Sequence, residues 1–334
     1  LGGIEAVIWT DTIQTIVLLG GAVVTIFFLI GGIEGGFGGM LDLAKANDKM
    51  TLVNLDFGPD SFTTLALWVI ILGGLGQNLS SYTSDQAVVQ RYLTTKDAKA
   101  AAKSIWANGI MAALGALLFF FIGTGLYAFY HTNPAQLDPT IQNDQVFPLF
   151  IGSELPVGLA GLIVAGIFAA AQSTVSTSMN STATTIVTDF MRPFNRCSSE
   201  AGYLKAARGL TLVMGVLGTL AGLLFISPEI RSLMSEYFKV IGMFMGALGG
   251  LFLLGIATTK ANATGAFVGL FVGVGLMIWI WQSTDTNGFL YSTIGLLTCL
   301  IVGYAVSVLL PGPQKNLENL TLHTQSKDRR QAAL

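Results

Sequence analysis

Hydroxyl-bearing residues are concentrated between Ala169 and Asp189, in a chain that otherwise consists largely of apolar runs. They recur mostly at three- and four-residue steps, which places them in one stripe along a helix. In a bilayer such a stripe has to face protein, water or an ion, because unsatisfied polar groups in hydrocarbon are costly. The stretch has no Cys, His or Glu, so it suits no transition metal, whereas neutral oxygens suit a hard, weakly charged cation. The stripe consists of Ser173, Thr174, Thr177, Ser181, Thr184 and Thr188.

Serine and threonine also have ordinary roles in membrane helices. They bond back to the carbonyl four residues earlier, or they line contacts between helices. That interpretation suits any one of these hydroxyls taken alone. It accounts poorly for so many on one helix, with Gln172 and Asn180 beside them. Together with backbone carbonyls, the hydroxyl oxygens predict a sodium site built from neutral ligands.

A carboxylate lies about two turns into the first apolar run, at Asp11 in the segment IEAVIWTDTIQ. It is an interfacial residue, the partner of a Lys or Arg, or an ion or proton site, and the last is the usual role of an acid within a membrane helix. No basic residue lies deep in any predicted helix to neutralise it, and the nearest to an exception is Lys239, close to the outer end of its helix. We therefore expect a bound cation as the partner of Asp11.

A second polar interruption covers residues 73–90, with the sequence GGLGQNLSSYTSDQAVVQ. Irregular or polar backbone at membrane depth is tolerated only beside a cavity or within protein, and broken helices form the midplane sites of secondary transporters. We interpret 73–86 as the wall of a hydrophilic cavity. The regularly spaced glycines in 242–250 and 265–273 are instead expected to pack helices closely. Asp85 has the alternative role of an interfacial cap near Arg91.

The composition is that of an integral membrane protein, since 52% of the 334 residues are hydrophobic and 11% are charged, against about 25% charged residues in soluble domains. A net charge of −2 offers no basic face for a nucleic acid. Cys197 and Cys299 form no disulfide framework, and neither His131 nor His323 has metal-ligand spacing around it. The sequence also lacks a nucleophile–base pair and a nucleotide fingerprint, so an enzyme is not expected.

The apolar runs that are long enough to cross a bilayer, at roughly 20 residues, predict eight membrane helices. A short amphipathic stretch near 137–150 is expected to lie on one surface. The chain starts with Leu and enters hydrophobic sequence at once, without a visible signal peptide, so we expect it to be part of a longer protein. The predicted spans are 4–30, 63–88, 104–130, 155–188, 204–226, 233–257, 263–282 and 289–310.

The distribution of Lys and Arg predicts how these spans are oriented. If the loop 91–103 is cytoplasmic, alternation places 13 of the 17 basic residues on that side or at its edges. Both the N-terminal end of the chain and its tail then lie in the cytoplasm, and the loop 31–62 faces outwards. We expect a transmembrane part over 1–310 and a polar cytoplasmic tail over 311–334, in a multi-pass protein of the plasma (inner) membrane.

Three segments carry a family pattern: GGIEAVIWTDTIQ, then QNLSSYTSDQAVVQRYL, then LPVGLAGLIVAGIFAAAQSTVSTSMNSTATTIVTDF. In this order and at these separations they resemble the sodium:solute symporter family, which includes sodium/glucose, sodium/multivitamin and bacterial sialic acid symporters. The resemblance covers nearly the whole chain. The amino-acid sequences of the first two segments are most similar to those of bacterial sialic acid symporters.

The resemblance implies an all-α integral membrane protein with the inverted-repeat fold of the amino-acid transporter LeuT, which has two five-helix repeats. The first predicted helix resembles the fifth core helix, the next five resemble the second repeat, and the last two resemble the trailing helices. The first four core helices are then missing, so the resemblance implies an N-terminally truncated chain.

The resemblance also implies two sets of sodium ligands. The family's general sodium site uses an Ala carbonyl and two hydroxyls of the eighth core helix, which match Ala170, Ser173 and Thr174. Its other ligands are carbonyls of the first core helix, which this sequence does not contain. A second site, present in some members, uses an Asp of the fifth helix with hydroxyls of the eighth. The matching residues are Asp11, Ser173, Ser176 and Thr177.

Two further positions match a substrate motif of the family. Asp85 and Gln86 stand where sugar-transporting relatives have an Asn-Gln pair that touches the substrate, and the Asp departs from that pattern. Gln77 and Ser81 belong to the same polar segment. We expect these four residues to line the solute.

The function implied is sodium-coupled symport of a small polar organic solute, similar to sialic acid or a sugar, by alternating access. The expected partners are that solute and the lipid bilayer, with sodium as the coupling ion, no organic cofactor and no nucleic acid, in a monomeric transport unit. The alternatives are a proton-coupled symporter that titrates Asp11 and the membrane input domain of a sensor. The tail after Pro311 is too short to be an enzyme domain, which argues against the sensor.

Overall fold

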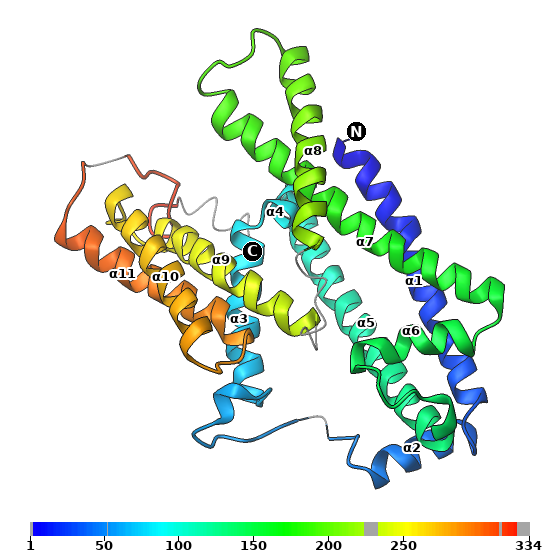
Figure 1. Ribbon diagram of the computed structural model, residues 1–334. Helices are drawn as coiled ribbons and strands as arrows, with labels where there is room; N and C mark the ends of the chain where they lie inside the picture. Colours follow the sequence, from blue (N-terminus) through cyan, green and yellow to red (C-terminus); the bar gives the residue numbers. More distant parts are fainter. Residues whose placement is uncertain (1–2, 52, 224–232, 314–315, 326–334) are drawn as a thin grey trace. The chain divides into compact units, whose positions relative to one another are not determined.

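The computed structural model describes the chain apart from residues 1–2, 52, 224–232, 314–315 and 326–334, and apart from the side chains of residues 3–8, 10, 11, 233 and 235. The chain divides into two compact units, one made of 1–51 and 105–231 and the other of 52–104 and 232–334. Within the described residues, both units consist of helices and the loops between them (Figure 1). The predicted all-α architecture is confirmed.

The first unit is organised around an antiparallel pair of long helices, α1 (Gly3–Gly31) and α7 (Val157–Thr185). Glycines let these backbones approach: a Cβ on Gly21 would lie 3.1 Å from Ile163 Cγ1, and Gly166 packs against the backbone of Leu18. α7 continues as a π-helical segment over Ile186–Met191. The unit also contains α2 (Gly36–Ala46), most of α5 (Ala98–Thr132), α6 (Asn143–Ser153) and α8 (Glu200–Leu223).

An apolar core holds α1, α2, α5 and α6 together at the C-terminal end of α1. Phe129 of α5 meets Phe150 of α6 edge to face, with ring centroids 5.1 Å apart, which is a favoured aromatic geometry. Helix α2 lies in the stretch predicted as an outward loop, and its buried Met40 joins this core. At 11 residues α2 is too short to span a membrane, and tertiary burial rather than a strong sequence pattern holds it.

The second unit packs α3 (Leu67–Ser84) and α9 (Leu233–Ala257) against α11 (Phe289–Leu309), which also packs against α10 (Ala263–Ser283). These helices meet at glycines. A Cβ on Gly250 would lie 2.6 Å from the Leu296 carbonyl oxygen, and a Cβ on Gly269 would lie 2.6 Å from that of Cys299. Because backbone cannot rotate away as a side chain can, these positions require glycine. The predicted packing role of the glycines in 242–250 and 265–273 is confirmed.

Seven helices in the described part of the chain are long and apolar enough to cross a membrane. They correspond to seven of the predicted spans, and α5 shows the largest difference, since it begins at Ala98 rather than near 104. The remaining span, predicted over 63–88, is instead two helices, the 18-residue α3 and then α4 (Gln86–Leu93). α3 is not among the seven because its second half is polar from Gln77 onwards.

The break between α3 and α4 falls at Asp85. Its backbone is extended, with φ −76° and ψ 110°, and its carboxylate accepts a hydrogen bond from the backbone N–H of Ala87 at 2.9 Å. A side-chain acceptor at this position satisfies one of the free N–H groups that begin a helix. The chain is therefore broken where the sequence predicts a polar interruption, and Asp85 has the role of a helix cap.

Candidate functional site

The contacts of Gly21 and Gly166 fix the register of α1 against α7. In an antiparallel pair, ten residues before Gly21 and ten residues after Ile163 are Asp11 and Ser173. At about 1.5 Å per residue, both backbone positions lie roughly 15 Å along the helices from the glycine contact. The acidic position of α1 and the start of the hydroxyl stripe therefore lie at one level of the helix pair.

Two oxygens expected in the general sodium site are neighbours on α7. The Thr174 hydroxyl Oγ1 lies 3.3 Å from the Ala170 carbonyl oxygen, to which it donates. This bond is long for an O–H···O pair, whose usual distance is about 2.7 Å. Thr174 is exposed, whereas Ala170 and Ser173 are half-buried. A weakly held hydroxyl beside a carbonyl can turn its lone pairs towards a cation at low cost.

The threonines nearer the C-terminal end of α7 make shorter bonds of the ordinary kind. The hydroxyls of Thr182, Thr184 and Thr185 donate to carbonyl oxygens four residues earlier at 2.9, 2.8 and 3.0 Å. Back-bonding of this type needs no ion to explain it. The weaker bond of Thr174 distinguishes it from these three threonines.

The hydroxyl residues expected in the second sodium site share one face of α7. Ser173, Ser176 and Thr177 are spaced by three and four residues, Thr177 is buried, and Ser173 and Ser176 are half-buried. Ser173 and Thr177 each have an interaction partner in the structure. The Asp11 side chain lies outside the described residues, so its pairing with these hydroxyls stays a prediction.

Gln14 is a polar residue at this level that the sequence interpretation passed over. It lies one turn after Asp11, opposite Ala170 by the same register, and its Oε1 atom is buried without a hydrogen-bond partner among the described residues. Leaving a buried acceptor unsatisfied costs about 1–3 kcal/mol. The i, i+3 spacing of Asp11 and Gln14 in an otherwise apolar run was the signal that could have identified it.

The polar segment of α3 is partly a packing surface. The Ser292 hydroxyl of α11 donates to Gln77 Oε1 at 2.6 Å. A Cβ on Gly76 would lie 2.7 Å from Thr293 Cα, and Gly73 meets the backbone of Phe289 in the same way. The interpretation of all of 73–86 as a cavity wall is therefore wrong for Gly73 and Gly76, which pack α3 against α11.

The other residues expected to line the solute lie near the α3–α4 break. Ser81 is half-buried on the last turn of α3, Asp85 caps α4, and Gln86 is exposed as the first residue of α4. They belong to the second unit, whereas the hydroxyl stripe belongs to the first. Solute contact by Gln77, Ser81, Asp85 and Gln86 stays a prediction.

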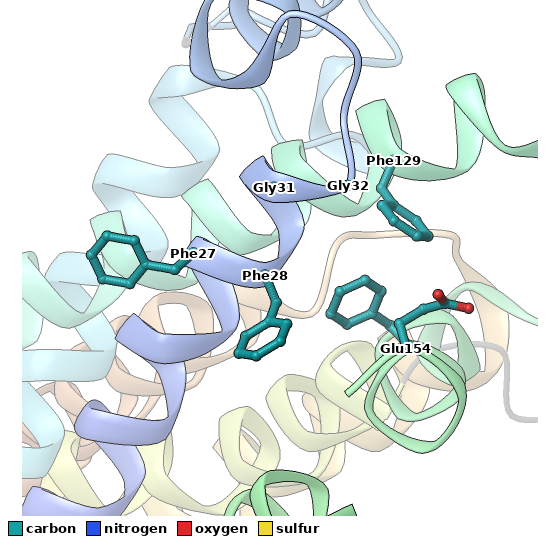
Figure 2. A pocket seen from close by; sticks show the side chains of 7 residues that line it. Phe27, Phe28, Gly31, Gly32, Phe129 and Glu154 are labelled. Carbon is teal, nitrogen blue, oxygen red and sulfur yellow. The ribbon is translucent and has the colours of Figure 1, made fainter. Parts of the chain in front are cut away.

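A separate pocket of about 470 Å³ lies at the other end of α1, in the aromatic core of the first unit. Figure 2 shows Phe27, Phe28 and Phe129 around it, with the Glu154 carboxylate at its edge. Gly31 lines this pocket 20 residues from Asp11, which is about 30 Å along the helix. It is therefore distinct from the hydroxyl level and contains none of the predicted sodium ligands.

An all-helical membrane protein with a helix broken at polar residues has the architecture of secondary transporters, whose sites lie at such breaks. A family model for the sodium:solute symporter family matches residues 1–273. The chain belongs to the sodium:solute symporter family, which is a family of transporters and not of enzymes.

Two bacterial relatives match most of the chain. It is 33% identical over 308 residues to the sodium/sialic acid symporter NanT of Aliivibrio fischeri, covering 91% of this chain and 60% of the relative. It is 33% identical over 326 residues to the sodium/sialic acid symporter SiaT of Proteus mirabilis, covering 96% of this chain and 64% of the relative. The chain thus spans less than two thirds of the length of these relatives.

Similarity extends to animal transporters and to a solved structure. The sodium-dependent multivitamin transporter of Oryctolagus cuniculus is 34% identical over 288 residues, covering 84% of this chain and 44% of the relative. The substrate-bound, outward-open state of a Na⁺-coupled sialic acid symporter matches with a TM-score of 0.80 and 33% identity, covering 95% of this chain and 64% of that one. The expected family and fold are confirmed.

Proposed function

We propose that the full-length protein containing this chain is a sodium-coupled symporter of a small polar organic solute. The observation that carries the proposal is the level of the α1–α7 pair at which Ala170, Thr174 and Asp11 occur together. Membership of the sodium:solute symporter family supports sodium as the transported cation. Sodium is a substrate here, carried across the membrane with the solute.

The general sodium site comprises the Ala170 carbonyl and the hydroxyls of Ser173 and Thr174. The weak Thr174–Ala170 hydrogen bond supports this assignment, because coordination sacrifices little internal bonding. A second sodium ion binds Asp11 with the hydroxyls of Ser173, Ser176 and Thr177. Sodium drives transport only if it binds one conformation more tightly than the other, and we propose that it favours the outward-facing state.

The solute is a sialic acid or a similar sugar-like compound, which binds beside Gln77, Ser81, Asp85 and Gln86. The two bacterial sialic acid symporters support this class at 33% identity. The break at Asp85 supports the location, because broken helices form substrate sites in transporters. The animal relative, a sodium-dependent multivitamin transporter, makes vitamins the natural comparison solutes.

We further propose that both ends of this chain face the cytoplasm of a plasma (inner) membrane and that residues 311–334 are a cytoplasmic tail. The bias of 13 of 17 basic residues towards one side supports this orientation. One copy of the protein forms the transport unit.

The test is uptake by the full-length protein in liposomes, with an imposed sodium gradient in one arm and an imposed pH gradient without sodium in the other. Labelled sialic acid, glucose and a monocarboxylate serve as solutes. Uptake of sialic acid in the sodium arm alone is the expected result. Uptake driven by the pH gradient without sodium would reject sodium coupling in favour of a proton symporter that titrates Asp11.

A further inference from the structure

A cavity of about 610 Å³ opens in the second unit where α9 ends and the last turns of α11 pass beside it. One end is polar and is formed by Thr258, Thr259 and Lys260, which follow α9, together with His323 of the tail. The other end is apolar and is formed by α11. Its residues are Leu300, Ile301, Tyr304 and Ala305.

The apolar wall reaches from the membrane surface into the hydrocarbon. Leu300 lies nine residues before the end of α11 at Leu309, which corresponds to a depth of about 13 Å. α9, α10 and α11 are all candidate membrane spans, so the loop that holds Lys260 lies at the membrane–water interface. Ile301 is 64% exposed and Tyr304 is 41% exposed, so the wall is open to an apolar ligand.

The tail is fixed to the end of α9, and this places His323 at the rim of the cavity. The backbone N–H of Leu322 donates to the Ile256 carbonyl at 2.9 Å, and His323 Nε2 lies 3.0 Å from the Ala257 carbonyl oxygen. Helix-end carbonyls lack intrahelical donors, so the tail satisfies two of them. A carbonyl only accepts, so Nε2 carries the hydrogen of this bond.

The polar end of the cavity complements a negative charge. Lys260 is exposed, and the described residues offer it no carboxylate within ion-pair distance. Thr258 and Thr259 lie on the same rim, and the Thr258 hydroxyl donates to the Leu254 carbonyl oxygen at 2.7 Å, which leaves the Thr259 hydroxyl to face an anion. An exposed ammonium group and a hydroxyl above an apolar wall match the phosphate and acyl chain of a phospholipid, and basic pockets between membrane helices bind such head groups.

We propose that this cavity binds an anionic phospholipid, with its phosphate at Lys260 and Thr259 and an acyl chain along Ile301 and Tyr304. The proposal does not depend on which solute or ion the protein transports. It identifies a lipid site on the trailing helices, separate from the hydroxyl level of α7.

The test is native mass spectrometry of the full-length protein with phosphatidylglycerol or with phosphatidylcholine of the same acyl chains. Lys260→Gln is expected to lower phosphatidylglycerol occupancy about fivefold, the effect of one surface Lys on an anionic lipid. The matched control is Lys99→Gln, an exposed Lys outside the cavity, which should leave occupancy unchanged. Ala305→Trp, which fills the apolar end, should also lower it.

Three outcomes would overturn the proposal. Equal losses in Lys260→Gln and Lys99→Gln would show non-specific attraction to basic charge. Equal occupancy by phosphatidylcholine in the unmodified protein would remove the role of the anionic head group. Competition by glycerol phosphate, which lacks acyl chains, at the same concentration as the lipid would assign the site to a soluble phosphate.

Discussion

The second unit and the first use small and polar residues in membrane helices in opposite ways. In the second, glycines of α9 and α10 contact the backbone of α11, a set of contacts here called the glycine seam. In the first, the hydroxyl-bearing residues of α7 range from the buried Thr177 and Ser181 to the exposed Thr174 and Thr182.

The difference separates residues whose role is helix packing from residues whose oxygens are available to bind an ion. Close contact with the backbone of the neighbouring helix fully explains why glycine stands at each position of the seam. Hydrogen bonding within the helix explains only some hydroxyls of α7. Those of Thr182, Thr184 and Thr185 donate to carbonyls of the same helix at normal distances, whereas that of Thr174 lies 3.3 Å from its acceptor carbonyl oxygen. Changes in the seam should therefore alter stability, and changes at the Thr174 level should alter ion binding.

The largest effect on stability is expected from Gly269→Val in the glycine seam. Its side chain would meet the Cys299 carbonyl and the backbone of Gly303, neither of which can move aside alone. Overpacking of this kind costs about 1–3 kcal/mol, so the melting temperature of the purified full-length protein should fall by several degrees. The control is Gly275→Val on the same helix, where a Cβ meets no atom within 4 Å. Equal melting temperatures of the two variants would contradict the packing role.

A smaller effect, confined to sodium binding, is expected from Thr174→Val. It removes a hydroxyl but keeps the shape, so the sodium concentration for half-maximal solute binding should rise about tenfold, which corresponds to about 1.4 kcal/mol. Thr182→Val is the control, since Thr182 is also exposed on α7 and also bonds four residues back. A similar sodium requirement in both variants would show that the stripe is ordinary back-bonding.

Asp85→Ala should destabilise the protein by about 1 kcal/mol, the usual cost of losing a helix N-cap. The lost bond is the one from Ala87 N–H at 2.9 Å. Asp85→Asn keeps an acceptor and should restore most of the stability. Thermal unfolding of both variants measures the cap, and solute affinity of Asp85→Asn measures substrate contact. If Asn and Ala destabilise equally, the cap is not the source of the effect.

The smallest effect on stability is expected from Glu200→Gln, at the first residue of α8. Arg192 donates to Glu200 at 2.6 and 2.8 Å, and this hydrogen bonding lowers the pKa of the Glu200 carboxyl below its ordinary value. A lowered folded-state pKa contributes stability above the unfolded pKa, and the contribution is lost as pH falls through the folded pKa. Both groups are exposed, so the loss is small.

Unfolding temperatures of the unmodified protein and of Glu200→Gln should therefore differ slightly at pH 7 and converge in acid below the usual carboxyl pKa of about 4.3. A difference that persists or grows in acid would assign it to another cause.

The sequence predicted the long helices and the glycine seam well, because apolar runs and evenly spaced glycines are local patterns. It also predicted a polar interruption over 73–90 from the density of polar residues, although it did not place the break between α3 and α4 at Asp85. Helix α2 was not predicted, because it contains no apolar run long enough to span a membrane. It is held instead by the burial of Met40 in the core. Gly73 and Gly76 were misjudged because their partners on α11 lie more than 200 residues away in sequence.

The sequence predicted a sodium site at the level of Asp11 and Ala170, but it did not identify the buried acceptor of Gln14 at that level. Its buried oxygen becomes evident only when α1 is packed against α7. The length of the Thr174–Ala170 bond, which distinguishes one threonine from its neighbours, is likewise a property of the folded helix.

The most direct test of the account is the number of sodium ions transported per solute, measured from reversal potentials of the full-length protein in liposomes. We predict about two for the unmodified protein, since we propose both a general site and a site containing Asp11 at the α1–α7 level. Asp11→Ala should reduce the number to about one while transport continues. An unchanged stoichiometry in Asp11→Ala would contradict the assignment of a second sodium ion to the pairing of Asp11 with the hydroxyls of α7.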